Sequence, residues 1–159
     1  MTKHPSFLQG LGYPVEKPAP AAEALYGVVW MAGRAQRQVA RALKPFALTP
    51  VKLNYLMIVR HIGKEEGLSQ REIARRLLID AGNVTHVLDD LQKKGWVVRD
   101  AGPDRRSNRI KITPKGARLL DEAWPAYKKV VNELTEGLPV PEQNRLVEIL
   151  THWRESLEG

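Results

Sequence analysis

The sequence predicts a mainly helical fold with one small β-hairpin, an α+β class, and three observations support this. Apolar residues recur at helical spacing over most of the chain from residue 22 onward. Two short helical patterns lie between Ser69 and Lys93, with a break at residues 78–82. Residues 96–113 then alternate apolar and polar side chains around a polar loop, which is typical of a hairpin.

Residues 1–21 are predicted to form a flexible N-terminal arm, because four prolines and two glycines interrupt the segment. The alternative is an extended segment that lies over a partner and buries its few apolar side chains. A first helix is predicted from Ala22 to Lys44, where a proline ends it. A second helix begins with Thr49 as its cap and runs to about Gly63, with an apolar stripe formed by Leu56, Val59 and Ile62.

The next two helices have the spacing of a helix-turn-helix. Ser69 and Glu72 form a capping-box pattern, so a helix is expected to begin near Ser69 and to bury Ile73, Ala74 and Leu77. Asp80 can cap the second helix, whose apolar stripe consists of Val84, Val87, Leu88 and Leu91. From the helices alone one alternative stays open, because any two amphipathic helices in a small bundle give a similar pattern.

The face of the second helix opposite this stripe is expected to be free to contact DNA. At about 100° per residue, that face carries a central row with polar residues on its flanks: Gly82, His86, Asp89 and Lys93, flanked by Asn83, Thr85 and Asp90. A helix in this position of a helix-turn-helix enters the major groove, where such side chains can reach base edges.

A basic hairpin follows. Gly95 is suited to the left-handed cap that ends a helix, and a strand from Trp96 to Arg99 comes next. The second strand, from Asn108 to Thr113, alternates apolar and basic residues as a half-buried strand should. The loop between the strands holds Arg105 and Arg106, which can follow phosphates or enter a narrow minor groove. A charge run is usually only a solvated face, but its position beside the helix-turn-helix favours DNA contact.

The C-terminal part is predicted to contain two helices. Thr113 caps the first, which Pro114 opens, and the last begins near Pro141. Both terminal helical regions carry more apolar surface than one small core can absorb, so a homodimer is expected. The alternative is that these helices pack only within one subunit. Two-fold symmetry would set the recognition helices about 34 Å apart on a pseudo-palindromic site.

Positive charge is concentrated in the predicted DNA-facing region. The chain has a net charge of +7; residues 69–118 hold 12 Lys and Arg against 6 Asp and Glu, and residues 119–159 hold 4 against 8. The first region can bind phosphate and the second would be repelled by it. The absence of cysteine excludes disulfides and thiolate metal sites. Because no apolar run is long enough for a signal peptide or membrane span, a cytoplasmic location without membrane contact is expected.

Three stretches resemble the MarR family of bacterial winged-helix regulators: L-S-Q-R-E-I-A-R-R-L, N-V-T-H-V-L-D-D-L-Q-K-K-G-W-V and D-R-R-S-N-R-I-K-I-T-P-K-G. The resemblance implies a single domain over residues 22–159. In it, a winged helix-turn-helix core (48–116) is flanked by dimerisation helices (22–47 and 117–159). It also implies that the second helix of the motif lies in the major groove and that the wing reaches the minor groove.

Individual residues follow from the same resemblance. Asp104 and Arg106 match the Asp-x-Arg pair of the family wing, in which the carboxylate steadies the arginine that contacts DNA. His86 departs from the pattern, because many relatives carry Arg there, and the base preference therefore does not carry over. Combined with the helical faces above, the predicted DNA-contacting residues are Ser69, Gln70, Arg71, Asn83, Thr85, His86, Asp89, Lys93, Asp104, Arg105, Arg106 and Arg109.

The expected function is that of a sequence-specific regulator of transcription that binds double-stranded DNA. The resemblance to the MarR family implies in addition that it is a repressor and that a small-molecule effector releases it. The alternative is a winged-helix module for protein interaction or architectural DNA binding, without an effector. A small aromatic or anionic effector is expected near Tyr26, Trp30, Arg34 and Tyr55. Aromatic residues at helical spacing also pack in cores, and this alternative stays open.

Enzymatic chemistry finds no support in the sequence. It has no Gly-rich phosphate loop, no Gly-x-Ser-x-Gly motif and no cysteine nucleophile. The histidines at positions 4, 61, 86 and 152 show no close metal-ligand spacing. We therefore expect neither an enzyme nor a cofactor or metal requirement.

Overall fold

The computed structural model describes residues 6–15, 19–77, 81–101 and 108–158. Its elements, in chain order, are α1 (Phe7–Gly10), α2 (Pro20–Leu43), a 3-10 turn η1 (Lys44–Phe46), α3 (Pro50–Ile58), a π-helical turn η2 (Val59–Gly63), α4 (Gln70–Leu77), α5 (Ala81–Lys93), β1 (Val97–Ala101), β2 (Asn108–Ile112), α6 (Pro114–Thr135) and α7 (Val140–Glu158). The predicted class, mainly helical with an antiparallel hairpin, is confirmed.

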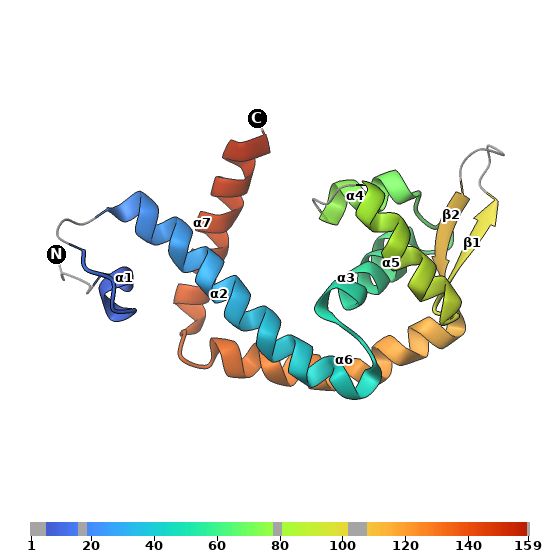
Figure 1. Ribbon diagram of the computed structural model, residues 1–159, viewed down its shortest axis with the longest axis horizontal. Coiled ribbons are helices and arrows are strands. Elements are labelled where there is room, and N and C mark those ends of the chain that lie inside the picture. The colour runs from blue at the N-terminus through green and yellow to red at the C-terminus, as the bar shows by residue number, and fades with distance from the viewer. Residues whose placement is uncertain (1–5, 16–18, 78–80, 102–107, 159) are drawn as a thin grey trace.

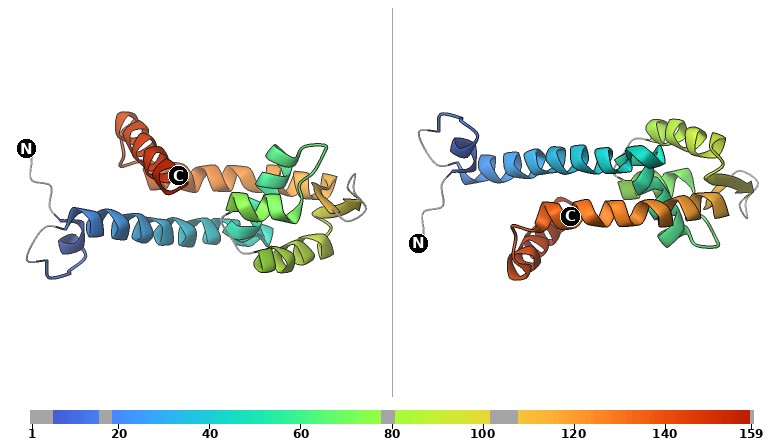
Figure 2. Two further views of the ribbon diagram at one scale, coloured as in Figure 1. Left: turned by 90° about the horizontal axis from the view of Figure 1, so that it is seen from above. Right: turned by 90° about the horizontal axis from the view of Figure 1, so that it is seen from below.

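The elements form two parts at opposite ends of a helical pair. α3, α4, α5 and the hairpin make a small packed body, which we call the winged unit (Figure 1). α2 and α6 run side by side in opposite directions and connect this unit with α1 and α7 at the far end (Figures 1 and 2). The winged unit is thus held at one end of a long support.

Local capping explains where the helices on either side of the winged unit begin. The hydroxyl of Thr49 accepts a hydrogen bond from the amide of Lys52 at 3.2 Å at the start of α3. The hydroxyl of Thr113 accepts one from the amide of Gly116 at 3.0 Å at the start of α6. Each cap is followed by a proline in the first turn, which needs no amide partner there. Both predicted caps are confirmed.

α4 and α5 pack against each other and the core through apolar residues that the periodicity predicted. The buried members are Ile73, Ala74, Val84, Leu88 and Leu91. Gly95, with φ at +72°, ends α5 in the predicted left-handed conformation. Residues 78–80, which include the predicted cap Asp80, lie outside the described residues.

The hairpin is tied to the segment that precedes α4. β1 and β2 pair in antiparallel register, with Arg99 opposite Ile110 and Asp100 opposite Arg109. On the other edge of β2, Leu68 and Ile110 exchange two backbone hydrogen bonds, of 2.7 and 3.0 Å. The base of the wing is therefore fixed by backbone contacts directly next to the helix-turn-helix.

The hydrophobic core lies mainly in the winged unit. The buried residue of α2 is Leu43, at its C-terminal end, and no residue of α7 within 140–158 is buried. Apolar residues farther along both helices face solvent, for example Val29 with 61% and Val147 with 63% of its surface exposed. The described chain does not cover the apolar faces of its terminal helices.

One prediction of local structure needs correction. Ile62 was expected on a buried stripe with Leu56 and Val59, but it is 48% exposed. The chain from Val59 onward is π-helical, and the wider turn rotates Ile62 away from the stripe.

Residues 6–15, the described part of the predicted flexible arm, contact α2, and the flexibility of residues 1–21 stays a prediction. The amide of Phe7 donates to the Glu23 carboxylate at 2.7 Å, and its ring meets Trp30 edge-on at 5.9 Å between centroids. The hydroxyls of Tyr13 and Tyr26 are 2.8 Å apart. Aromatic contacts thus connect this segment with α2.

Candidate nucleic-acid interface

The exposed side of α5 forms the centre of the candidate interface. Thr85, His86, Asp89 and Lys93 are exposed, whereas Val84 on the other side of the helix is completely buried. Asn83 belongs to α5, but its side chain lies outside what the structure describes. The structure therefore presents several of the predicted contact residues together on one solvent-facing side.

The first turn of α4 borders this surface. Arg71 is exposed there, and the Gln70 side chain accepts a hydrogen bond from the Thr85 hydroxyl at 3.4 Å, which links α4 with α5. Ser69 is occupied by capping: its hydroxyl accepts from the amide of Glu72 at 3.2 Å. Of the predicted contacts on this turn, Arg71 is the one whose charged group faces solvent.

One carboxylate oxygen of Glu72 joins the start of α4 to the wing. Oε2 accepts from the amide of Ser69 at 2.8 Å, from its hydroxyl at 2.7 Å, and from Nη1 of Arg109 at 2.7 Å. The two hydrogen bonds from Ser69, with a further contribution from the charge of Arg109, lower the pKa of Glu72 below its ordinary value. The predicted capping box is confirmed. The sequence did not predict the ion pair with Arg109.

A second ion pair connects the wing to the exposed side of α5. Nη1 of Arg99 donates to the side-chain oxygen of Gln92 at 2.7 Å, and Nη2 donates to the Asp89 carboxylate. Arg99 compensates the charge of Asp89, which would otherwise repel an approaching phosphate. Sequence reasoning missed Arg99. The available signal was its strand position, because the alternation places it on the same inward side as buried Val97.

Asp90 ties α5 to the rest of the winged unit. Its carboxylate lies 2.7 Å from Nζ of Lys52 on α3 and 2.8 Å from Nζ of Lys94. The hydrogen bond from Lys52, followed by that from Lys94, lowers the pKa of Asp90. The exposed side of α5 is thus held in orientation by contacts to α3 as well as to the wing.

The wing itself is described only in part. Asp104, Arg105 and Arg106 lie within residues 102–107, outside the described residues, so their predicted DNA contacts stay predictions. Arg109 is described, and its guanidinium is directed to Glu72 on α4.

The residues predicted to line an effector crevice come from two helices, α2 and α3. Tyr55 has no exposed surface and belongs to the core, where burial raises the pKa of its hydroxyl. Tyr26, Trp30 and Arg34 all belong to α2. There Trp30 contacts the segment 6–15 and the guanidinium of Arg34. For Tyr55 the core-packing alternative is the correct one, because its ring helps to fill the winged unit.

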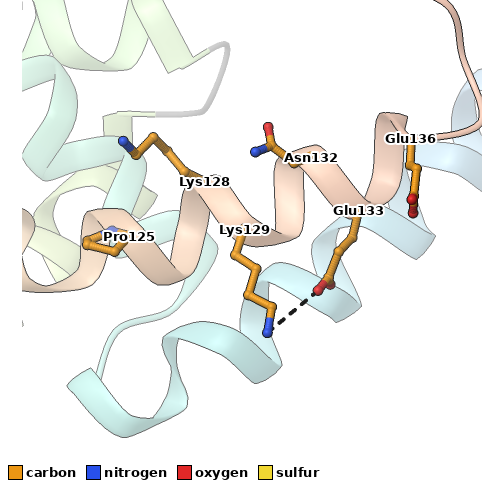
Figure 3. A pocket seen from close by; sticks show the side chains of 6 residues that line it. All are labelled: Pro125, Lys128, Lys129, Asn132, Glu133 and Glu136. Atoms are coloured by element: carbon orange, nitrogen blue, oxygen red, sulfur yellow. Dashed lines mark ion pairs between the residues drawn. The ribbon is translucent and has the colours of Figure 1, made fainter.

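Two hollows of the described surface are lined by residues other than the predicted effector residues. One of about 540 Å³ runs along α6. Figure 3 shows the side chains of α6 and of its C-cap residue, Glu136, that line it: Pro125, Lys128, Lys129, Asn132, Glu133 and Glu136. Lys129 and Glu133 pair across it at 3.9 Å. A smaller hollow of about 150 Å³ lies between α2, α3 and α6 and includes Val39, Leu53 and Tyr127. Neither hollow is lined by the predicted effector residues.

The described part of the chain shows neither a metal cluster nor a membrane-spanning helix. Within residues 6–15, 19–77, 81–101 and 108–158, no group of three His, Cys, Asp or Glu side chains is placed to hold a metal ion. Over the same ranges, no helix combines the length and the apolar character needed to cross a bilayer.

Comparison with known proteins identifies the family. Residues 48–107 match the model of the MarR family. Over 104 residues the chain is 30% identical to the HTH-type transcriptional regulator MhqR of Bacillus subtilis (strain 168). This alignment covers 65% of this chain and 70% of MhqR. The chain belongs to the MarR family. This membership confirms the predicted class, a transcriptional regulator and not an enzyme.

A second relative matches over a shorter part of the MarR-family chain. The uncharacterized HTH-type transcriptional regulator YkoM of Bacillus subtilis (strain 168) is 37% identical over 81 residues. The match covers 50% of this chain, and the chain spans about half of that relative, 53% of its length.

Two solved structures share the overall fold of this chain. A mutant MarR from E. coli complexed with operator DNA superposes with a TM-score of 0.73 and 26% identity, over 79% of this chain and 89% of that one. CouR from Rhodococcus jostii RHA1 bound to p-coumaroyl-CoA superposes with a TM-score of 0.74 and 27% identity, over 84% and 93%.

Proposed function

We propose that this MarR-family chain binds a pseudo-palindromic duplex operator as a homodimer and represses transcription by occupying promoter DNA. The observation that carries the proposal is the exposed side of α5, where Thr85, His86 and Lys93 face solvent beside a basic hairpin. The E. coli relative complexed with operator DNA supports it. Because such a regulator works on the chromosome, we place it in the cytoplasm.

The dimer is supported by the uncovered apolar faces of the terminal helices. A groove of about 520 Å³ lies between α1, α2 and α7, and its lining includes Phe7, Val28, Met31, Leu146 and Leu150. A helix of a second copy with the same apolar stripe would fill such a groove and remove these side chains from water. Two-fold symmetry would then set the recognition helices about one turn of DNA apart.

Selection of bound sites from random duplexes, at a stated salt concentration, tests the proposal. We expect a pseudo-palindromic consensus and a strong salt dependence. For about eight phosphate contacts per dimer, the plot of log affinity against log salt should have a slope near −7. A flat salt response, or no enrichment of any duplex, would refute DNA binding.

Variants on α5 separate base contacts from phosphate contacts. His86→Ala should relax the preference at particular base pairs, whereas Lys93→Gln should weaken binding to all sequences and reduce the salt slope by about 1.8, because the dimer loses one phosphate contact from each subunit. Arg154→Gln on the acidic helix α7 removes the same charge far from the interface and should bind like the wild type. If His86→Ala weakens binding to all sequences equally, His86 contacts the DNA backbone and not the bases.

The competing interpretation is a winged-helix module for protein interaction or architectural DNA binding. Arg106→Ala discriminates between the two, because the family resemblance makes Arg106 a DNA contact in the wing. We expect a severe loss of duplex binding while the dimer stays intact by sedimentation. Unchanged binding would favour the interaction module.

Release by a small-molecule effector is a further part of the proposal. Its support is CouR, a relative at 27% identity whose structure contains p-coumaroyl-CoA. We expect an aromatic acyl-CoA thioester or a free aromatic carboxylate to release the operator in a DNA-binding assay. Loss of DNA binding should follow the ligand concentration, since the ligand must favour the unbound arrangement. Operator binding that is unaffected by both classes would favour a regulator without an effector of this kind.

A further inference from the structure

Arg109 is aimed at the helix-turn-helix and not along the wing. Arg109 lies on β2, directly opposite Asp100 of β1. Its guanidinium reaches the carboxylate of Glu72 on α4 at 2.7 Å. Its side chain is 29% exposed, and that of Glu72 is 36% exposed. The ion pair therefore bridges two elements that are 37 residues apart in the sequence.

The bridge closes a ring of contacts at the base of the wing. Leu68 and Ile110 are joined through their backbones, and Ser69, which follows Leu68, binds the Glu72 carboxylate through its amide and its hydroxyl. The same carboxylate oxygen then holds Arg109, the neighbour of Ile110. A carboxylate that accepts several charge-assisted hydrogen bonds at once is a firm anchor, because each donor limits its movement.

We propose that Arg109 is a positioning residue that holds the wing in register with α4 and α5 through Glu72. This inference rests on the proposed DNA-binding function and replaces the expectation that Arg109 contacts DNA directly. A guanidinium paired with a carboxylate contributes little net charge, so it releases few counterions when DNA binds. Its contribution to affinity comes from the placement of the wing relative to the recognition helix.

Three variants and one control test this role. Arg109→Gln removes the cation. Glu72→Gln removes its partner but keeps a side chain that can complete the capping box with Ser69. The double variant removes both. Lys111→Gln is the matched control, because Lys111 loses the same charge from the same strand but pairs with Asp100 within the hairpin, at 3.1 Å.

Operator affinity and its salt dependence are measured for all of them. We expect each single variant to weaken binding by about three- to tenfold, the range of a partly buried charge-assisted hydrogen bond. The double variant should be no weaker than the worse single variant, and the salt slope should stay at the wild-type value. Lys111→Gln should weaken binding less than Arg109→Gln.

A direct phosphate contact gives a different pattern. Arg109→Gln would then reduce the salt slope by about 1.8, since each subunit of the dimer loses one contact, and Glu72→Gln would bind as well as the wild type or better, because it frees the arginine. Either result overturns the inference. So does a loss in Lys111→Gln equal to that in Arg109→Gln, which would indicate a general effect of charge.

Amide hydrogen exchange of the free protein tests the positioning without DNA. The amides of Leu68 and Ile110 form the backbone bridge, and both should exchange about fivefold faster in Arg109→Gln and in Glu72→Gln, but not in Lys111→Gln. Unchanged exchange in the first two variants overturns the inference. If the wild type binds no duplex, the proposed function fails while this measurement still decides whether the ion pair holds the wing.

Discussion

The winged unit and the terminal helices both carry apolar stripes at helical spacing, but only the winged unit buries its stripe within one chain. Leu88 and Leu91 of α5 have no exposed surface, whereas Val147 and Leu157 of α7 are 63% and 76% exposed. The winged unit therefore buries its apolar side chains without a second chain. The terminal helices carry an uncovered apolar face. In the proposed homodimer a second copy covers this face and sets the distance between the two winged units.

Ion pairs show the same contrast. In the winged unit they connect different elements, such as α3 with α5 through Lys52 and Asp90. On α7, Arg145 pairs with Glu148 three residues away, and their side chains are 72% and 65% exposed. Bridges between elements fix an orientation, whereas exposed pairs within one helix add little. Ion pairs within one chain thus fix the relative orientation of the elements of the winged unit.

The largest effect on stability is expected in the core of the winged unit. Leu88→Ala removes a completely buried side chain from α5 and should lower the free energy of unfolding by about 3 kcal/mol. Val51→Ala, on the exposed side of α3, where Val51 is 52% exposed, should change it by less than about 0.5 kcal/mol. Urea denaturation at one protein concentration compares them. Equal losses would mean that the winged unit has no distinct core.

The next prediction concerns the terminal helices. Leu150→Glu places a charge in the groove between α1, α2 and α7 and should give a monomer that keeps its helical content. Operator affinity should fall at least about 100-fold, because the two recognition helices are no longer linked. Sedimentation, circular dichroism and DNA binding measure these effects.

The control for this variant is one residue away. Thr151→Glu adds the same charge on the polar face of α7, which also carries Asn144, Glu148 and Glu155, and should stay dimeric. A dimeric Leu150→Glu protein would show that the apolar groove is not part of the dimer interface.

A smaller effect is expected where α6 begins. A Cβ atom at Gly116 would lie 2.2 Å from the carbonyl oxygen of Trp96 and 3.1 Å from Cγ1 of Ile112. Gly116→Ala should therefore push α6 away from the hairpin and cost about 2 kcal/mol of stability in urea denaturation. Gly137→Ala is the control, because a Cβ there meets nothing within 4 Å. If Gly116→Ala leaves the free energy of unfolding unchanged, α6 is not tightly packed against the hairpin.

Features that depend on neighbouring residues were predictable from the sequence. The caps at Thr49, Ser69 and Thr113, the glycine that ends α5 and the buried side of α5 are all local in origin. Each needs only the residues within one or two turns. The winged helix-turn-helix could therefore be predicted before any long-range contact was known.

The features that sequence reasoning missed depend on distant partners. The fold-back of residues 6–15 requires Phe7 to meet Trp30, and the role of Glu72 in the wing requires Arg109. No pattern within either segment contains its partner. The exposure of Ile62 has another cause, since helical periodicity assumes 3.6 residues per turn and the π-helical turn at Val59–Gly63 departs from it.

The smallest expected effect is a pH dependence that distinguishes the two kinds of ion pair. The hydrogen bond from Lys52, with that from Lys94, lowers the pKa of Asp90 in the folded protein below its ordinary value of 3.8. A lowered carboxyl pKa stabilises the fold at any pH above the ordinary value, and this contribution is lost as the pH falls through the lower folded value. Because the pair is partly exposed, we expect less than about 1 kcal/mol.

Denaturation from pH 7 to the lowest pH at which the protein stays folded tests this expectation. Asp90→Asn should be less stable than the wild type at pH 7, and the difference should shrink below about pH 3.8, where the unfolded wild type takes up a proton. Glu148→Gln, which breaks the exposed pair on α7, should follow the wild type throughout. If the difference in stability between Asp90→Asn and the wild type does not change with pH, the effect of the substitution does not come from the charge of Asp90. The contrast between bridges that connect elements and pairs within one helix would then not extend to their energetics.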